Sequence, residues 1–286
     1  MFVPRRILEE KLLQMLAEDI GQGDVTAAAV VPANVTAEAA VIAKEPGIAA
    51  GIEEAVILAE SLGLKTKTEV ADGEEVKSKQ VLMRMSGNAR TILSAERTLL
   101  NLVSRMSGIA TTTRKLVEEL RKIKDSAKIA ATRKTGLGLL YFDKKAVLIG
   151  GGDPHRLHLD DMILVKDNHV AIAGNVKKAV EAAKKNSSFT KKIEVEVSTA
   201  EDAVIAAKAG ADIVMLDNFS PKQIRAAVES LKKAGLFGKI LLEASGGINT
   251  KNLHEYASTQ VNILSLGELT HSAKSLNISM EITRVG

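Results

Sequence analysis

The polar residues that could do chemistry stand directly after short aliphatic runs in the second half of the chain. They are Thr132, Arg133, Lys134, His155, Arg156, Lys166, Glu196, Asp217, Ser245, Gly246, Gly247, Ser265 and Gly267. In parallel α/β proteins the carboxyl ends of the strands open onto one face, and ligands bind there. Each of these residues alone has an ordinary explanation as a turn, a cap or a hydrogen-bonded loop residue. Their shared position after successive runs predicts one cavity.

Positive charge is the main feature of this set. Arg133 and Arg156 can each donate two parallel hydrogen bonds to a carboxylate or a phosphate. Lys134, Lys166 and His155 add further cationic groups. A pocket of this composition favours a ligand that carries several negative charges.

Two glycine turns predict where a phosphate would bind. Gly246-Gly247 precedes an expected helix over Thr250–Tyr256, and Ser265-Leu266-Gly267 precedes another helix near Thr270. The N–H groups at a helix N-terminus bind phosphate, and turns after the last strands of α/β barrels are a common phosphate site. We therefore expect these two turns to adjoin each other at the edge of the cavity.

Two carboxylates stand among the cations. Glu196 and Asp217 suit ribose hydroxyls, a magnesium ion or a developing positive charge. His169, by contrast, is expected to be a hydrogen-bonded loop histidine and not a ligand-binding group.

The aliphatic runs predict buried parallel strands, most of them followed by a loop and an Ala/Lys-rich helix. Seven strands are expected, at Lys128–Ala131, Ala146–Ile149, Met162–Val165, Ile193–Val197, Asp212–Leu216, Lys239–Leu242 and Val261–Leu264. The helical segments AVEAAKKN and AVIAAKAG between them are close to one another in sequence, as repeated strand–helix units would be. The pattern predicts an α/β fold with an incomplete barrel of about seven strands.

The first third of the chain predicts a separate α/β sandwich domain. A helix over residues 1–20 is expected to end in the loop Gly21–Thr26, and a helix over Asn88–Ser107 is expected to end at Gly108. A small mixed sheet with helices on one face is expected from Ala37–Ala43, Glu53–Ser61, Lys65–Val70 and Val81–Met85. Alternation in Ile278–Thr283 predicts a strand that returns to this sheet. The expected domains are 1–108 together with 269–286, and 109–268.

Composition excludes several classes of protein. The 286 residues include no cysteine, which excludes disulfides, zinc-thiolate sites, iron–sulfur clusters and thiol nucleophiles. The 39 basic and 35 acidic residues nearly balance and only 2% are aromatic, so a nucleic-acid partner is not expected. No apolar run reaches the length of a membrane span, and the N-terminal segment lacks a signal-peptide core. We therefore expect a cytoplasmic protein with no membrane partner.

Several ordered motifs resemble the quinolinate phosphoribosyltransferase family. They are Ser94-Ala95-Glu96-Arg97 through Leu100-Asn101, Ser107-Gly108-Ile109-Ala110-Thr111, Thr132-Arg133-Lys134-Thr135, Gly150-Gly151-Gly152, His155-Arg156, Lys166-Asp167-Asn168-His169, Glu194-Val195-Glu196-Val197, Leu216-Asp217-Asn218-Phe219 and Glu243-Ala244-Ser245-Gly246-Gly247-Ile248. The resemblance covers nearly the whole chain, including Glu18-Asp19-Ile20-Gly21 and Gly23-Asp24-Val25-Thr26.

The resemblance implies a two-domain enzyme of NAD biosynthesis, with an N-terminal α/β sandwich and a barrel-like C-terminal domain of fewer than eight strands. Enzymes of this family join quinolinate to phosphoribosyl pyrophosphate with Mg²⁺, and they release pyrophosphate, CO₂ and nicotinate mononucleotide. The resemblance also implies a homodimer, because the arginine that matches Arg97 reaches the site of the neighbouring subunit.

Residue roles follow from the same resemblance. The charges of quinolinate and pyrophosphate would be held by Arg97, Arg133, Lys134, His155, Arg156 and Lys166. Glu196 and Asp217 would face the ribose and the metal, and Lys134 and Lys166 would join them as catalytic residues. The 5′-phosphate site would comprise Ser245, Gly246, Gly247 and Gly267, and Thr132 and Ser265 complete the substrate-binding set.

One segment departs from the family pattern, and two other enzyme classes stay open. The family continues after Thr132-Arg133-Lys134-Thr135 with threonine, proline, glycine and soon an arginine, whereas this chain has Gly136-Leu137-Gly138-Leu139-Leu140 and lacks the cation at Leu140. One alternative is a barrel enzyme in which Lys166 forms a Schiff base on another sugar phosphate, as aldolases do. The other is a paralogue associated with molybdate transport, although Lys166-Asp167-Asn168-His169 favours the quinolinate enzyme.

Overall fold

The chain folds into two compact units in this computed structural model, which describes residues 3–123 and 127–286. The first unit comprises the described residues of Met1–Arg114, Tyr141–Gly151 and Ala273–Gly286, and the second comprises those of Lys115–Leu140 and Gly152–Ser272. The division places 109–114 and 141–151 in the first unit and 269–272 in the second, which differs from the expected boundaries.

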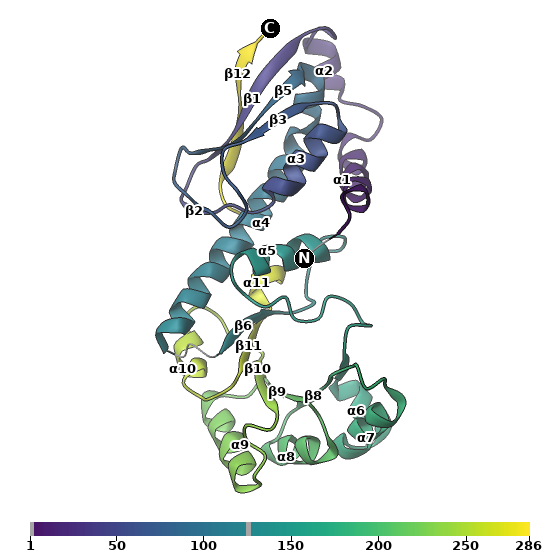
Figure 1. The fold of residues 1–286 in the computed structure, drawn as a ribbon, viewed down its shortest axis with the longest axis vertical. Coiled ribbons are helices and arrows are strands. Elements are labelled where there is room, and N and C mark those ends of the chain that lie inside the picture. The colour runs from purple at the N-terminus through teal and green to yellow at the C-terminus, as the bar shows by residue number, and fades with distance from the viewer. Residues whose placement is uncertain (1–2, 124–126) are drawn as a thin grey trace. The chain divides into compact units, whose positions relative to one another are not determined.

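A four-stranded antiparallel sheet forms the framework of the first unit (Figure 1). In spatial order its strands are β12 (Ile278–Val285), β1 (Thr36–Ala43), β5 (Val81–Asn88) and β3 (Lys65–Thr68). The expected mixed sheet is therefore wrong, because all three pairings are antiparallel. The expected return of the C-terminal strand is confirmed, since Met280 of β12 lies opposite Val41 of β1. A separate antiparallel pair joins β2 (Gly47–Ile48) to β4 (Glu75–Val76).

The helices of the first unit each bury apolar side chains. They are α1 (Arg5–Ile20), α2 (Val25–Val30), α3 (Ile52–Ser61), most of α4 (Ala89–Ile123) and most of α5 (Leu140–Ile149). α1 buries Leu8, Leu12 and Leu16, which are one turn apart, and packs on α3, which in turn packs on β3 and β5. The expected loop Gly21–Thr26 is shorter than predicted, because Asp24 accepts a hydrogen bond from the Ala27 N–H and caps α2.

α4 continues through Gly108, where the sequence predicted its end. Gly108 has ordinary helical geometry, and a Cβ atom there would lie 1.8 Å from the backbone oxygen of Lys274. The glycine therefore permits close packing of the C-terminal segment on the helix and does not terminate it. Neither α4 nor any other helix in the described part of the chain is long and apolar enough to cross a membrane.

Six parallel strands form one sheet in the second unit (Figure 1). In spatial order they are β6 (Lys128–Ala131), β11 (Ile263–Leu266), β10 (Leu241–Ser245), β9 (Ile213–Asp217), β8 (Ile193–Val197) and β7 (Ile163–Val165). All neighbouring pairs are parallel, as predicted. No ladder within residues 3–123 and 127–286 joins β6 to β7, so the barrel is incomplete as expected.

The strand count is one lower than expected because Ala146–Ile149 belongs to α5. This run is the last part of a helix that is buried on most sides, with Phe142, Ala146 and Val147 in the core. Its charged residues are buried with partners: Asp143 accepts hydrogen bonds from Arg105 at 2.7 and 2.8 Å. A short apolar run that is buried all round has no periodicity that would separate helix from strand.

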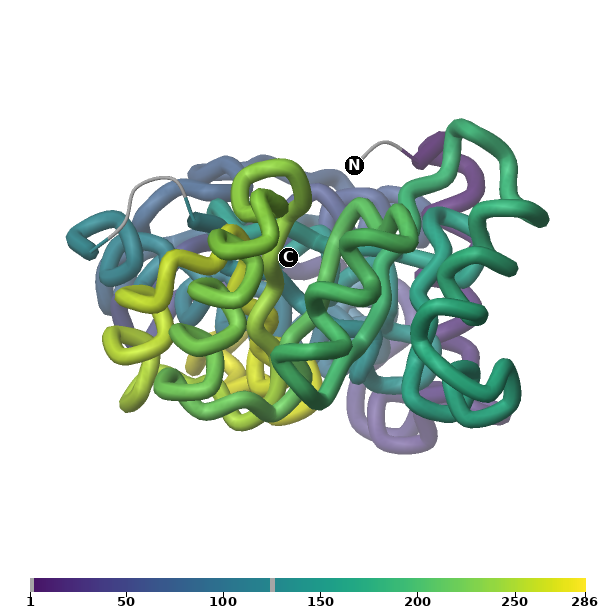
Figure 2. Tube along the Cα trace, turned by 90° about the horizontal axis from the view of Figure 1, so that it is seen from below, coloured from purple at the N-terminus to yellow at the C-terminus, as the bar shows by residue number. Residues whose placement is uncertain are grey.

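The helices that follow the strands lie side by side along the outside of the sheet (Figures 1 and 2). They are α7 (Val176–Asn186), α8 (Ala200–Ala209) and α9 (Pro221–Lys233), and the shorter helices are α6 (Asp167–Ala173), α10 (Leu253–Ala257) and α11 (Glu268–His271). α7 packs on β7 and β8, and α8 packs on β8 and β9. These helices cover one face of the sheet, whereas the carboxyl ends of the strands border the site.

Candidate active site

The carboxyl ends of the six parallel strands border a cavity of about 520 Å³ in the second unit. The predicted residues on its wall are Thr132, Arg133, Lys134, His155, Arg156, Lys166, Glu196, Asp217, Ser245, Gly246 and Ser265. A volume of this size is typical of sites for small molecules. The structure therefore brings together residues that are more than a hundred positions apart in sequence.

Three predicted residues stand apart from this wall in the described structure. Gly247 follows Gly246 in the turn after β10, and Gly267 follows β11 directly. Arg97 is an exposed residue of α4 in the first unit. Its predicted contribution to a neighbouring subunit stays a prediction.

Two guanidinium groups contribute much of the positive charge of the cavity. Burial and the nearby charge of Arg133 lower the pKa of Arg156, while the carboxylates of Glu194 and Glu196 oppose that shift. Arginine stays protonated at neutral pH, so the charge of Arg156 is held in a partly buried position and is also repelled by the charge of Arg133. An anionic ligand between them would relieve this repulsion.

Lys166 and Glu196 form an ion pair across two adjacent strands. Lys166 follows β7, Glu196 lies in β8, and the ammonium Nζ donates to Oε1 of the carboxylate. The backbone N–H of Lys166 also donates to Nδ1 of His169 at 2.9 Å. The interpretation of His169 as a hydrogen-bonded residue is therefore confirmed, but it lies in the first turn of α6 and not in a loop.

Asp217 is held by the residue that follows it. The Asn218 side-chain amide donates to Asp217 Oδ2 at 2.7 Å, and the Asn218 backbone N–H donates to the Ser245 carbonyl at 2.8 Å. Asn218 has a φ of 57°, which asparagine tolerates better than most residues. A Cβ atom on Gly246 would lie 2.1 Å from Asn218 Oδ1, and its φ is +93°. Only glycine fits at position 246 with this neighbour.

The two glycine turns differ in detail from the predicted phosphate site. The expected helix over Thr250–Tyr256 begins only at Leu253, so the Gly246-Gly247 turn is separated from its N-terminus. The Gly247 carbonyl accepts hydrogen bonds from the side chain of Asn252 at 2.9 Å. The expected helix near Thr270 is α11, and the Thr270 hydroxyl donates to the Lys134 carbonyl at 2.8 Å. This bond ties the loop after β6 to the turn after β11.

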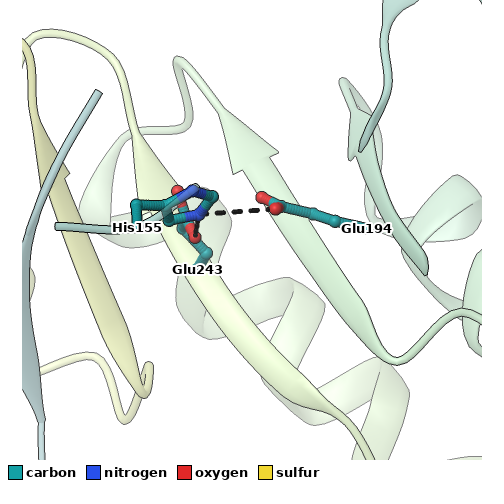
Figure 3. A group of neighbouring side chains, drawn as sticks. All are labelled: His155, Glu194 and Glu243. Carbon is teal, nitrogen blue, oxygen red and sulfur yellow. Dashed lines mark hydrogen bonds and ion pairs between the residues drawn. The ribbon is translucent and has the colours of Figure 1, made fainter. Parts of the chain in front are cut away.

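His155, which lines the cavity, contacts two buried carboxylates through one ring nitrogen (Figure 3). Its Nε2 atom is 3.1 Å from Glu243 Oε2 and 3.4 Å from Glu194 Oε2. Burial alone lowers the pKa of His155, but the charge of both carboxylates and their contacts with Nε2 outweigh it and raise the pKa from 6.5 to about 10. Burial, together with the charge of Glu243, raises the pKa of Glu194 although His155 opposes that shift. The raised pKa of His155 favours the protonated ring.

Sequence reasoning did not assign a role to several residues on or below the cavity wall. Those on the wall are Ala131, Leu164, Asp167, Met215, Asn218 and Glu243, and Glu194 lies buried beside His155. Glu194 and Glu243 carried a usable signal, because each is a carboxylate flanked by apolar residues inside a strand. A buried charge is costly unless it has a partner, so such a residue predicts a buried cation beside it.

The segment that departs from the family pattern lies between β6 and α5. Leu137 is fully exposed, and Gly138 has a φ of +77° that favours glycine. Leu140 is the first residue of α5. Residues 136–140 include no basic residue, so this segment does not supply the cation that the family pattern places at position 140.

Family models match both parts of the chain. The model for the C-terminal domain of quinolinate phosphoribosyl transferase matches residues 109–281, and the model for its N-terminal domain matches residues 24–107. The chain is 44% identical over 269 residues to a probable carboxylating nicotinate-nucleotide pyrophosphorylase of Methanothermobacter thermautotrophicus, covering 94% of this chain and 96% of that protein. It is 37% identical to the human carboxylating nicotinate-nucleotide pyrophosphorylase over 245 residues, covering 86% of this chain and 82% of that protein.

Solved structures agree with the sequence comparisons. NadC from Streptococcus pyogenes superposes with a TM-score of 0.89 at 34% identity, covering 100% of this chain and 99% of that one. The nicotinate-nucleotide pyrophosphorylase from Francisella tularensis has a TM-score of 0.89 at 37% identity, covering 99% and 98% of the two chains. The chain therefore belongs to the quinolinate phosphoribosyltransferase family.

Proposed function

We propose that this chain transfers the phosphoribosyl group of phosphoribosyl pyrophosphate to quinolinate, with release of pyrophosphate and CO₂, and so makes nicotinate mononucleotide for NAD biosynthesis. The observation that supports it best is the convergence of five cations, Arg133, Lys134, His155, Arg156 and Lys166, on one cavity of a chain from this family. Quinolinate has two carboxylates and the cosubstrate has three phosphate groups. Two such anions repel each other in water, so the site has to supply positive charge.

Quinolinate would bind where the cations are densest. Burial and then the charge of Arg133 lower the pKa of Arg156, and a planar dicarboxylate offers both arginines bidentate partners. His155 adds a cation at the base of the same cavity. Holding both substrates in a reactive orientation can lower the barrier by about 7–11 kcal/mol, which makes positioning a large part of catalysis.

Phosphoribosyl transfer would begin with attack of the pyridine nitrogen on the sugar carbon as pyrophosphate leaves. The bond between that carbon and the pyrophosphate oxygen breaks as the carbon–nitrogen bond forms, and positive charge develops on the ribose. Glu196 and Asp217 are the carboxylates on the cavity wall that can stabilise this charge. Lys134 and Lys166 can neutralise the charge that accumulates on the leaving group.

Decarboxylation would follow on the same nucleotide without a separate cofactor. Once the pyridine nitrogen is quaternary it withdraws electrons from the adjacent carbon. The carboxylate next to it can then leave as CO₂, and the electron pair left on that carbon takes up a proton. The cations that bind the ring hold it in place through both steps.

Magnesium would bind through the cosubstrate and two protein carboxylates. Mg²⁺ prefers oxygen ligands and is usually held by one or two carboxylates together with substrate phosphates. Glu196 and Asp217 supply hard oxygen atoms, and neither belongs to a group of three close ligands in the described residues, which fits a metal carried by its substrate. The ion would supply Lewis-acid stabilisation of the leaving pyrophosphate.

We further propose that the enzyme acts as a cytoplasmic homodimer. The exposed position of Arg97 on α4 leaves its guanidinium available to a second copy of the chain, as the family resemblance implies. Sedimentation analysis of wild type and complementation between inactive Arg97→Ala and Lys166→Ala chains test this. Recovery of activity on mixing the two variants supports a shared site, and its absence in a mixed dimer contradicts it.

The assay for the proposed reaction contains quinolinate, phosphoribosyl pyrophosphate and Mg²⁺, and it follows nicotinate mononucleotide and labelled CO₂. We expect both products in equal amounts. Nicotinate in place of quinolinate is the control for substrate choice, because it lacks the carboxylate that leaves. Mononucleotide formation from nicotinate alone, or borohydride trapping of a sugar phosphate on Lys166, would contradict the proposal.

A further inference from the structure

The surroundings of His155 fix both its position and its charge. Nε2 of the ring faces both Glu194 of β8 and Glu243 of β10, and both carboxylate side chains are almost fully buried at 0% and 1% exposure (Figure 3). From this geometry we infer that Glu194 and Glu243 are positioning residues that hold His155 as a permanent imidazolium, so that it binds quinolinate as a fixed cation and does not act as a base. The inference rests on the proposed function for the identity of the bound anion.

The first support is that most oxygen atoms of Glu194 and Glu243 are buried without a hydrogen-bond donor among the described residues. Both Glu194 oxygens and Glu243 Oε1 are buried without a hydrogen-bond partner among the described residues. Among the described residues, both carboxylates form ion pairs with Nε2 of His155, at 3.4 and 3.1 Å, and Glu194 also feels the charge of Arg156. Two buried carboxylates beside one imidazole strongly favour its protonated form.

The second support is the backbone of His155. Its φ is 54°, which is uncommon for a residue other than glycine, and its N–H donates to Asp153 Oδ1 at 2.8 Å. The chain therefore accepts an unfavourable backbone conformation to place this ring. Such strain persists where the surrounding contacts determine the position of the side chain, as the two carboxylates do here.

The other charged groups around the ring do not reverse this balance. Asp153 lies on the same segment, Arg156 is the next residue, and Arg133, Lys166 and Glu196 line the same cavity wall. The cations face the ligand space, whereas the carboxylates in contact with Nε2 are Glu194 and Glu243. Burial lowers the pKa of His155, but the charge of these two carboxylates and their contacts with Nε2 outweigh burial and raise the pKa to about 10.

A divalent metal is the competing occupant of the same three residues. One ligand atom from each of His155, Glu194 and Glu243 lies within 4.8 Å of the others, which a tetrahedral ion requires. A metal would have to displace the imidazole proton, because only neutral imidazole binds a metal. Because the pKa of the ring is raised, a proton competes with a metal for Nε2 at neutral pH. Calorimetry with Zn²⁺ decides between the two occupants.

The decisive measurement is a nuclear magnetic resonance titration of the histidine rings, with His155→Asn used to assign the His155 signals. We expect the wild-type ring to stay protonated from about pH 5.5 to 8.5, where an ordinary histidine titrates. In Glu243→Gln the midpoint should fall by about one to three pH units, because one neighbouring negative charge is gone. Glu181→Gln, an exposed carboxylate of α7, should leave it unchanged.

Kinetics then separate positioning from a structural role. In wild type the KM for quinolinate should be independent of His155 ionisation below pH 8.5, whereas in Glu243→Gln it should rise with pH as the ring loses its proton, with a smaller change in kcat. A wild-type His155 that titrates near pH 6.5 would overturn the inference. So would tight binding of Zn²⁺ alone, measured by calorimetry, that is lost in Glu194→Gln and Glu243→Gln.

Failure of the inference and failure of the proposed function are distinguishable. The ring titration needs no substrate, so it tests the imidazolium even if quinolinate is not turned over. The wild-type titration also decides the question if the buried glutamate variants do not fold. Conversely, turnover of quinolinate by an enzyme whose His155 titrates normally would support the function and overturn the inference.

Discussion

The ammonium of Lys166 and the carboxylate of Glu196 are paired across the ends of β7 and β8, inside the cavity that the substrates would occupy. The pair is partly exposed, since the Lys166 side chain is 45% accessible and that of Glu196 is 14%. Phosphoribosyl transfer needs a positive charge near the leaving pyrophosphate and a negative charge near the ribose, and this pair can provide both. Lys166 can turn to the leaving pyrophosphate while Glu196 faces the ribose.

Glu196→Gln should lower turnover much more than substrate binding. The substitution keeps the shape of the side chain and removes the charge that would stabilise the developing cation, so we expect kcat to fall by about 10²–10³-fold. Single-turnover quench experiments and equilibrium binding of phosphoribosyl pyrophosphate separate the two effects. Glu229→Gln on the surface of α9 is the control. Equal single-turnover rates in the Glu196 variant and wild type would remove Glu196 from the mechanism.

Arg156→Ala should weaken quinolinate binding by about 1.5–3 kcal/mol, or roughly ten- to a hundredfold in Kd, because a carboxylate would lose a charged hydrogen-bond partner that is partly buried. Arg133→Ala should act in the same direction, and it should also raise the pKa of Arg156, since one repulsive neighbour is gone. Titration calorimetry with quinolinate measures both effects on affinity. Arg225→Ala, an exposed arginine of α9, is the control. Unchanged affinity in both site variants would show that quinolinate binds elsewhere.

Much of the second unit could be predicted from the sequence because its strands are buried on both faces. Runs such as Ile-Val-Met-Leu at 213–216 are aliphatic without alternation, and polar residues mark the point where such runs end. The same rule failed at Ala146–Ile149, because a helix buried on most sides gives the same short apolar run. Its charged residues, which pair with Arg105 and Glu54, were the signal against a strand.

The fine structure of the site depends on contacts that no local pattern contains. Nothing in the sequence near Gly108 shows that the Lys274 carbonyl packs against it, so the glycine resembled a helix terminator. The partners of His155 are likewise 39 and 88 positions away in sequence. A buried glutamate inside a strand signals that a cation is needed, but only the fold shows which cation provides it.

Gly246→Ala should strain the backbone, because the φ of Gly246 is positive, and should also displace Asn218 from Asp217. The added Cβ would meet Asn218 Oδ1 at 2.1 Å, so the amide that holds Asp217 has to move. Gly235→Ala is a matched control, because Gly235 also has a positive φ but has no atom within 4 Å of the added Cβ. We expect both variants to lose about 1–3 kcal/mol of stability from strain. Only Gly246→Ala should raise the KM for phosphoribosyl pyrophosphate as well.

Gly108→Ala should destabilise the first unit although alanine favours helices. The new methyl group would lie 1.8 Å from the Lys274 backbone oxygen, and a backbone atom cannot yield as a side chain can. Overpacking of this kind typically costs about 1–3 kcal/mol, which exceeds the gain of about 1 kcal/mol in helix propensity. Urea unfolding measures the loss, with Glu118→Ala on the exposed face of α4 as the control. A variant as stable as wild type would mean that the C-terminal segment does not pack against Gly108.

Stability should fall as the pH rises from about 7 toward 10, and His155 should account for part of the fall. The pKa of its ring is raised from 6.5 to about 10 in the folded state, because the carboxylates outweigh burial. This contribution is complete below the unfolded pKa of 6.5 and is lost as the pH rises through about 10. In between, one proton held only by the folded state gives a slope of about 1.4 kcal/mol per pH unit. Urea unfolding of wild type and His155→Asn at several pH values measures it: the variant should be less stable at pH 7, and its deficit should shrink toward pH 9.5. A deficit that stays constant over this range would show that the folded and unfolded states bind the His155 proton equally well.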